Sequence, residues 1–171
     1  SIAVALDKEL PSHEIHNLLV RAEVDAILFS AKMEDKTLDA LEGISGVDLR
    51  IRMNGVSIDP DVKSWETVME EGRNALLEGC RQFMDVEIDP DVMCALLFTS
   101  GTTGNSKGVM LSHRNIAANV YNMSKYVKIR RPGGGLSVLP MHHTYELTCH
   151  VFTGLYQGMA IAICQGLRYV Q

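Results

Sequence analysis

The sequence lacks the features that mark several large classes of protein. None of its apolar runs approaches the roughly 18 residues that a membrane-spanning helix needs, so we expect no transmembrane segment. Lysine and arginine form no cluster, and the net charge of −5 gives no reason to expect binding to nucleic acid or to an anionic membrane. Internal repeats and low-complexity segments are also missing from the sequence.

Cysteine pairs with metal or redox spacing are missing too. The four cysteines are scattered along the chain without a CxxC pattern: Cys80, Cys94, Cys149 and Cys164. This distribution predicts reduced, buried thiols and a cytoplasmic location rather than a disulfide scaffold. With 171 residues, of which 46% are hydrophobic and 22% charged, the composition is that of an ordinary globular protein. The length favours a single domain.

Short apolar runs alternate with helical patterns along the chain. Buried strands are predicted at 2–6, 26–29, 94–98, 108–111, 136–139 and 160–164, and an edge strand at 49–53. Helices are predicted near 11–23, 33–41, 64–80, 112–127 and 145–157, with Ser12, Ser64 and Ser112 as N-caps. Strands that alternate with helices predict an α/β protein with a largely parallel sheet flanked by helices.

A polar loop interrupts this pattern. Residues 99–108 read TSGTTGNSKG, between the apolar runs CALLF and VML. Glycines let backbone N–H groups converge on an anion, hydroxyl groups donate further hydrogen bonds, and Lys107 supplies a charge that can follow a phosphate. The composition therefore predicts a polyphosphate-binding loop, and the alternative is an ordinary surface turn.

The loop is not a Walker A motif. That motif requires the order G-x-x-x-x-G-K-S/T, whereas Ser106 and Gly108 stand at the sixth and eighth positions counted from Gly101. The segment VML also intervenes before the predicted cap Ser112, so the loop does not open directly into a helix. We therefore predict a strand–loop–strand hairpin in which loop amides, hydroxyl groups and Lys107 would be the phosphate donors.

Two motifs carry a resemblance to a known family. LLFTSGTTGNSKGVMLSHRNI resembles the phosphate-binding motif of the adenylate-forming (AMP-binding) enzymes, S/T-S-G-S/T-T-G-x-P-K-G-V, with Ser106 where proline is most common. LSVLPMHHTYE resembles the family's next core motif, in which a histidine after LP, here His143, lies near the acyl pocket. The longer sequence stretches, among them VALDKELP and GLYQGMAIAIC, are most similar to those of long-chain acyl-CoA synthetases.

The resemblance implies a reaction and a set of site residues. It implies ATP-dependent activation of a carboxylic acid, a long-chain fatty acid, to an acyl-adenylate and then to acyl-CoA, with ATP and Mg²⁺, and with coenzyme A as co-substrate. Lys107 and His143 would take part in catalysis, His143 by shaping the carboxylate or acyl site. Positioning and charge neutralisation would supply most of that catalysis. The residues implied to hold the β- and γ-phosphates are Thr99, at the edge, Ser100, Gly101, Thr102, Thr103, Gly104 and Lys107.

The same resemblance indicates missing parts. Family members are several times longer, and nothing here resembles their YGxTE motif, their ribose-binding aspartate or the C-terminal domain with its adenylation lysine. We therefore expect part of the large N-terminal domain, with β/α units over about 1–85 and the phosphate-loop and acyl-site region over about 90–171. We expect this part to be inactive alone, with the Mg²⁺ ligands outside it. A non-catalytic nucleotide-binding module and an adenylation domain that serves a carrier protein are the alternatives.

Three side chains near the second motif have a spacing that would also suit a metal ion. His143, Glu146 and His150 stand at i, i+3 and i+7, on one face of a helix. The H-E-x-x-H pattern of zinc enzymes is not matched, so we predict no metal site. His142 and His150 are interpreted as ordinary packing or surface histidines.

Overall fold

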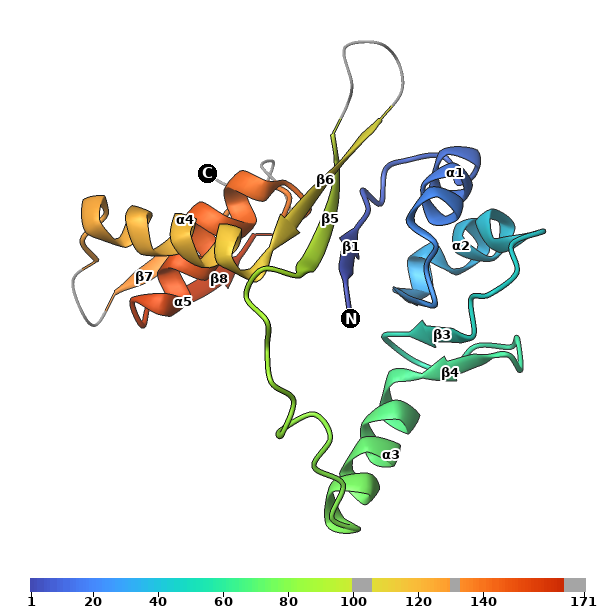
Figure 1. The fold of residues 1–171 in the computed structure, drawn as a ribbon. Coiled ribbons are helices and arrows are strands. Elements are labelled where there is room, and N and C mark those ends of the chain that lie inside the picture. The colour runs from blue at the N-terminus through green and yellow to red at the C-terminus, as the bar shows by residue number, and fades with distance from the viewer. Residues whose placement is uncertain (100–105, 130–132, 165–171) are drawn as a thin grey trace. The chain divides into compact units, whose positions relative to one another are not determined.

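The computed structural model describes residues 1–99, 106–129 and 133–164. The chain divides into two compact units (Figure 1). The inserted unit is Lys8–Ile88, and the outer unit consists of Ser1–Asp7 and Asp89–Gln171. The first seven residues therefore belong with the second half of the chain, and each unit is described by itself.

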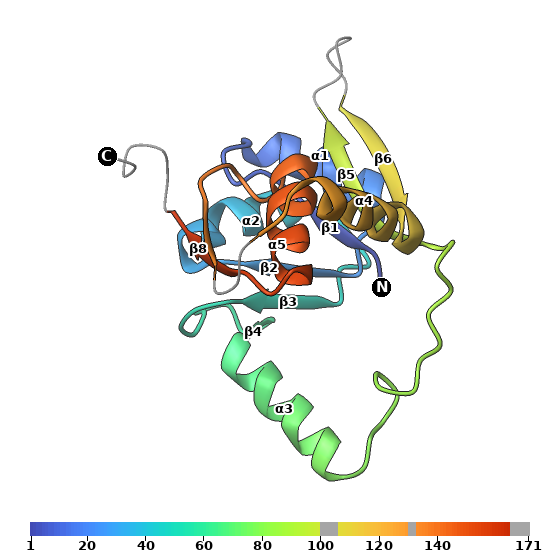
Figure 2. The ribbon, with the colours of Figure 1, turned by 90° about the vertical axis from the view of Figure 1, so that its left-hand side faces the viewer.

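The inserted unit is a small parallel sheet with helices. Its strands form the order β2-β3-β4, and both pairings are parallel. Helix α1 packs against α2, and the two lie on one side of the sheet while α3 extends away on the other (Figures 1 and 2). Apolar side chains from α1, α2, β2 and β3 form the core, among them Leu19, Leu41, Phe29 and Ile51. The elements are α1 Ser12–Ala22, β2 Ala26–Phe29, η1 Ala31–Met33, α2 Glu34–Leu41, β3 Leu49–Arg52, β4 Val62–Ser64 and α3 Trp65–Leu77.

Two details predicted for this unit are wrong. The segment 49–53 was expected at an edge, but β3 is the central strand because the unpredicted β4 pairs with its second side. Its polar side chain Arg52 is used inside the unit, where it donates hydrogen bonds to Glu34 and to the Val56 carbonyl. Ser12 does not cap α1, because Pro11 takes the N-cap position and its carbonyl already accepts from the N–H of Glu14 and Ile15.

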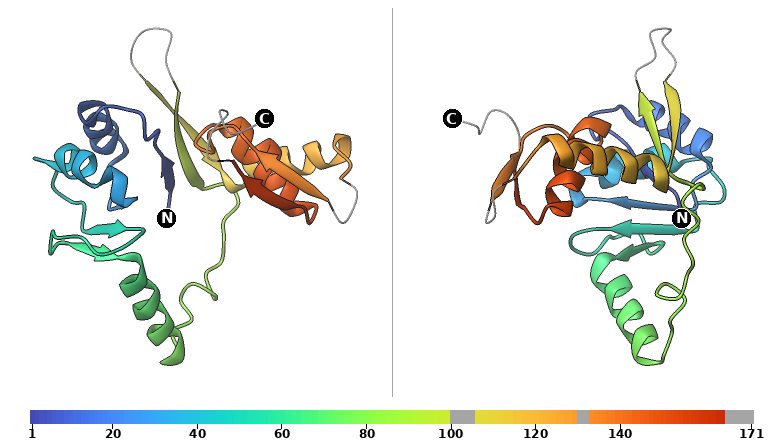
Figure 3. Two further views of the ribbon diagram at one scale, coloured as in Figure 1. Left: turned by 180° about the vertical axis from the view of Figure 1, so that it is seen from behind. Right: turned by 60° about the vertical axis from the view of Figure 1, so that its left-hand side comes forward.

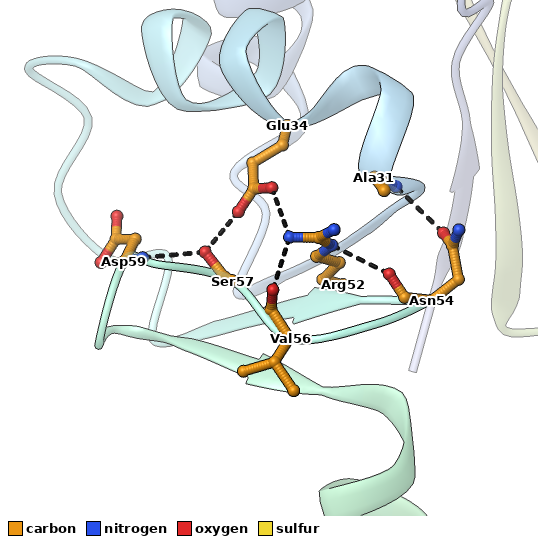
Figure 4. A network of polar contacts seen from close by, with 7 residues as sticks. All are labelled: Ala31, Glu34, Arg52, Asn54, Val56, Ser57 and Asp59. Carbon is orange, nitrogen blue, oxygen red and sulfur yellow. Dashed lines mark hydrogen bonds and ion pairs between the residues drawn. The ribbon is translucent and has the colours of Figure 1, made fainter.

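Arg52 ties the connection between β3 and β4 to the start of α2 (Figure 4). Its guanidinium donates to Glu34 Oε2 at 2.8 Å, to the carbonyl of Val56 at 2.7 Å and to that of Asn54 at 2.9 Å. Ser57 donates to the second oxygen of the same carboxylate. Because the arginine and glutamate side chains are only 19% and 13% exposed, these bonds are shielded from water and hold the connection in one conformation.

The described residues of the outer unit form two sheets. In the order β1-β5-β6, β1 pairs parallel and β6 antiparallel with the central β5, while β7 and β8 form a parallel pair. Helix α4, the π-helix η2 and α5 contact one another, and α5 also contacts β8 (Figure 3). The elements are β1 Ala3–Ala5, β5 Met93–Thr99, β6 Lys107–Ser112, α4 His113–Tyr126, β7 Gly134–Ser137, η2 Tyr145–Phe152, α5 Thr153–Tyr156 and β8 Ala160–Ile163.

The predicted α/β class with mostly parallel pairing is confirmed, although the described strands form three small sheets instead of one. The predicted strand at 136–139 ends at Ser137 and begins earlier, since Gly134 already pairs with Ala160. The prediction of four buried cysteines is wrong in degree: Cys80 is exposed and the other three are half-buried. Among the helices described, none is long and apolar enough to cross a membrane.

Candidate active site

The polar loop connects two paired strands, as predicted. In the antiparallel pair β5–β6 the last partners are Thr99 and Lys107, and the Thr99 hydroxyl donates a long hydrogen bond of 3.4 Å to the Lys107 carbonyl. Both residues are exposed. The predicted phosphate-binding residues between them lie outside the described residues: Ser100, Gly101, Thr102, Thr103 and Gly104. The structure thus brings together the two ends of the loop, Thr99 and Lys107.

Side-chain packing explains why these strands approach closely beside the loop. Ala95 and Leu97 of β5 are buried, and Leu96 and Phe98 alternate with them along the strand. A Cβ atom added to Gly108 would lie 3.1 Å from Leu96 Cδ1 and 3.5 Å from Phe98 Cε1. Glycine at this position therefore leaves room for two apolar side chains next to Lys107.

The opposite end of the hairpin is fastened by polar contacts. Arg114 donates to both carboxylate oxygens of Asp91, at 2.5 and 2.8 Å. The hydrogen bond from Arg114 lowers the pKa of Asp91, and the same bond raises the pKa of Arg114. Ser112 and Asn115 form a reciprocal capping box at the start of α4, which satisfies backbone groups that a helix end leaves open. The strands are thus fixed at their base, and the loop is at the other end.

The carboxyl ends of β1 and β5 lie at the same edge of their sheet. The two strands are parallel with Ala5 opposite Leu97, so Asp7 and Thr99 each follow two residues later. His142 Nε2 lies 3.6 Å from Asp7 Oδ2 at this edge. The second motif therefore reaches the edge of the sheet from which the polar loop departs. Polar residues that follow parallel strands commonly form ligand sites at such edges.

His143 is exposed and lies between β7 and η2. Its ring centroid is 4.3 Å from that of His142, with the ring planes tilted by 44°. Its N–H donates to the Pro140 carbonyl at 3.1 Å, and its own carbonyl accepts from the Leu147 N–H at 3.1 Å. An exposed ring on a backbone held at both sides is available to contact a substrate.

Beneath this segment lies a buried carboxylate. Glu146 is 3% exposed and accepts a hydrogen bond of 2.8 Å from His150 Nδ1. Burial opposes ionisation of this carboxyl, but the nearby Ser137 hydroxyl and His150 outweigh it and hold the pKa of Glu146 below its ordinary value of 4.5. The buried Ser137 Oγ meets no partner within hydrogen-bond geometry in the described part of the chain. We call Ser137, Glu146 and His150 the carboxylate cluster.

Sequence reasoning assigned the partners of these histidines incompletely. Glu146 and His150 contact each other, whereas His143 lies apart at the surface. Over the described ranges no three metal-binding side chains converge. Asp7 was not singled out, although a polar residue directly after the apolar run IAVAL was a usable signal. The role of Ser137 had no such signal, because serine is common at strand ends.

Comparison with known proteins agrees with this geometry. The described residues place the two ends of a polar loop and a histidine segment at one edge of an α/β sheet. A family model described as AMP-binding enzyme matches residues 1–169. The chain belongs to the AMP-binding enzyme family, and the predicted resemblance is confirmed.

Individual relatives and solved structures are similar to this chain to different extents. Peroxisomal long chain acyl-CoA synthetase 6 of Arabidopsis thaliana is 29% identical over 96% of this chain. The chloroplastic long-chain-fatty-acid–acyl-carrier-protein ligase AEE15 of the same plant is 44% identical over 42% of it. A red-emitting luciferase from Phrixothrix hirtus has a TM-score of 0.80 at 19% identity, covering 96% of this chain and 31% of its own. ATP-bound MatB from Rhodopseudomonas palustris has a TM-score of 0.67 at 22% identity, covering 94% and 30%.

The chain spans only part of these proteins. It covers 24% of the length of long chain acyl-CoA synthetase 6 and 10% of the length of the AEE15 ligase. The two structural similarities are below 25% identity and concern the fold. The activity of a whole protein is therefore a matter for proposal.

Proposed function

We propose that this chain forms part of a longer acid–thiol ligase that activates a carboxylic acid with ATP and transfers the acyl group to coenzyme A. The observation that carries the proposal is the edge of the β1-β5-β6 sheet. The ends of the polar loop, Thr99 and Lys107, and the segment with His142 both belong to this edge. Phosphate-binding groups and an acyl-site histidine must lie near each other if a carboxylate is to attack the α-phosphate.

Within this proposal the residues have separate tasks. Ser100, Gly101, Thr102, Thr103 and Gly104, with Thr99 at the edge, would donate hydrogen bonds to the β- and γ-phosphates, and Lys107 would add a positive charge. His143 would shape the site of the carboxylate and need not transfer a proton. Mg²⁺ would arrive with ATP and partly neutralise its phosphates, with ligands outside this chain.

A long-chain fatty acid is the proposed substrate. The similarity to long chain acyl-CoA synthetase 6 extends over 96% of the chain, which supports this class of acid. We also propose that the protein acts in the cytoplasm on small-molecule substrates, and that residues 90–171 supply the phosphate and acyl contacts. Fractionation of cells that produce the tagged protein tests the location.

The reaction is tested with the longer protein, by exchange of labelled pyrophosphate into ATP in the presence of fatty acids of graded length. We expect exchange that depends on the acid and is greatest for long chains. Binding of ATP without exchange for any acid would instead support a non-catalytic nucleotide-binding module.

A carrier protein is the second candidate acceptor. The observation that favours it is the 44% identity, over 72 residues, to a ligase that acts on acyl-carrier protein. The two acceptors are compared after adenylation, with coenzyme A in one reaction and phosphopantetheinyl acyl-carrier protein in the other. Faster thioester formation on coenzyme A is expected, and faster transfer to the carrier would reverse the assignment.

A further inference from the structure

The carboxylate cluster lies at the two ends of the segment that carries both histidines. This segment, residues 138–144, begins directly after Ser137 of β7 and ends just before η2. The Ser137 carbonyl accepts from the Cys164 N–H at 2.8 Å, which fixes the first end to β8. The second end depends on Glu146, because that residue is buried in the first turn of η2.

A missing side chain on β7 leaves space for His150. A Cβ atom added to Gly135 would lie 2.6 Å from His150 Nε2 and 2.7 Å from Met159 Cε. Contacts this short cannot exist, so the imidazole lies directly over the backbone of β7. The other ring nitrogen, Nδ1, donates to Glu146. The histidine thereby fixes the distance between β7 and the carboxylate.

The helix type points to the same segment. Residues Tyr145–Phe152 form a π-helix, a rare conformation that is frequent at functional sites. Its wider turn is supported by side chains: Glu146 and His150 are bonded four positions apart, and Thr153 Oγ1 donates to the Thr148 carbonyl at 2.9 Å. The bond between Glu146 and His150 starts in the first turn of η2, which directly follows the segment that carries His143.

We propose that Glu146, held by His150 over Gly135, is a positioning residue that sets the place of His143 in the acyl site. The proposal rests on the proposed function. A buried carboxylate bonded to a histidine could equally stabilise the fold and leave the reaction untouched. The experiment must therefore separate loss of stability from loss of positioning.

The first experiment measures pyrophosphate exchange by the longer protein. Glu146→Gln keeps the shape of the side chain but removes its charge, and we expect a 10- to 100-fold lower kcat, as a misplacement of about 1 Å can cause. The KM for ATP should stay within about twofold, because the phosphate contacts come from the loop. The exposed Glu70→Gln is the matched control and should equal wild type.

A second pair of variants tests the proposal even if Glu146→Gln does not fold. His150→Asn places an amide N–H near the position of Nδ1 and should retain most of the activity, whereas His150→Leu should lose it. Equal activities of these two variants would overturn the proposal, as would equal activities of Glu146→Gln and wild type.

A double-mutant cycle with His143→Ala tests whether Glu146 acts through that histidine. If it does, Glu146→Gln lowers exchange in the wild-type background and has less than a twofold further effect when His143 is absent. An undiminished effect in the His143→Ala background would show a purely structural role and overturn the proposal.

One readout does not depend on the reaction. The imidazole ¹³C resonance of His143 in selectively labelled protein should shift in Glu146→Gln and stay unchanged in Glu70→Gln, and an unshifted resonance in Glu146→Gln would contradict the proposal. Wild-type protein without any exchange activity would count against the proposed function, and the resonance would still decide whether Glu146 positions His143.

Discussion

Most of the buried polar residues in the described part of the chain belong to the outer unit. Ser137, Glu146, Thr148 and Thr153 are each at most 3% exposed, and all belong to β7, η2 or α5. Burial of polar groups costs free energy unless they are hydrogen-bonded. Stability in this region therefore depends on a few specific bonds, and single substitutions should have effects that an apolar core would not show.

Lys107→Ala is expected to reduce pyrophosphate exchange. Lys107 is the only cation of the sequence stretch 99–108, and a hydrogen bond to a charged group contributes about 1.5–3 kcal/mol, or roughly 10- to 100-fold in rate. Exchange should fall by this factor while thioester formation from added acyl-adenylate changes less. Lys128→Ala, another exposed lysine of the outer unit, is the control. A Lys107→Ala variant with wild-type exchange would exclude the phosphate role.

Glu146 should make stability depend on pH in the acidic range. Its pKa is lower in the folded protein than its ordinary value, so folding favours the ionised form. The stabilisation is complete above the ordinary value of 4.5 and disappears as the pH falls through the lower folded value. Urea unfolding of Glu146→Gln between pH 7 and pH 3 should show a smaller loss of stability than wild type. Parallel curves for the two proteins would contradict the assigned shift.

At the scale of single elements, two of the three N-caps predicted from the sequence are confirmed and one is wrong. Ser64 and Ser112 cap α3 and α4 as predicted, because each hydroxyl accepts from a backbone N–H three residues on. Ser12 was predicted on the same grounds, yet Ser12 is already the first residue of the helix and the N-cap is Pro11. Proline is suited to a helix start because it has no N–H to leave unsatisfied.

Ser64→Ala and Ser12→Ala form a matched pair in one unit. Loss of a capping hydroxyl typically costs about 1 kcal/mol, and Ser64 also bonds the Thr67 hydroxyl at 2.9 Å. Ser64→Ala should therefore lower the free energy of unfolding by about 1–2 kcal/mol, while Ser12→Ala should change it by less than about 0.5 kcal/mol. Urea titrations followed by circular dichroism would measure both. Equal losses would mean that Ser12 contributes to α1 in solution.

The sequence predicted local elements better than their assembly. The positions of the strands at 26–29 and 94–98 and of the hairpin partner of 94–98 were predictable from apolar runs bounded by polar residues. The burial predicted for the hairpin partner is wrong, because residues 107–110 of β6 are exposed. The strand at Val62–Ser64 was missed because only Val62 of its three residues is apolar. The separation into three sheets and the carboxylate cluster could not be predicted, since both depend on contacts between residues distant in sequence, such as Gly135 with His150.

At the scale of the whole molecule, the outer unit is built from two segments, one before and one after the inserted unit in the sequence. Its central strand β5 has β6 on one side and β1, from the start of the chain, on the other. The inserted unit has its own sheet and its own apolar core. The two units should therefore respond separately to changes at the N-terminus.

Deletion of residues 1–7 is expected to weaken only the outer unit. Without β1, one side of β5 loses its strand partner, so those amides of residues 95–97 that point toward β1 should exchange with solvent at least about tenfold faster. Those amides of residues 26–29 that point toward β3 serve as the internal control and should keep their rates, because their partners lie within the inserted unit. Hydrogen exchange measured by NMR would test this. Uniform acceleration across both units would show that they unfold together.

The pairing of Ala3 with Ala95 also imposes an order of events on biosynthesis. Translation proceeds at about 5–20 residues per second, so roughly 5–20 s separate the emergence of β1 from that of its partner. The inserted unit, whose sheet pairs only strands from Lys8–Ile88, has time to fold in that interval. Its compaction shortens the disordered chain that must close when β5 arrives, which lowers the entropic cost of pairing. Until then, residues 2–6 of the nascent chain are an apolar segment whose strand partner, β5, has not yet been synthesised.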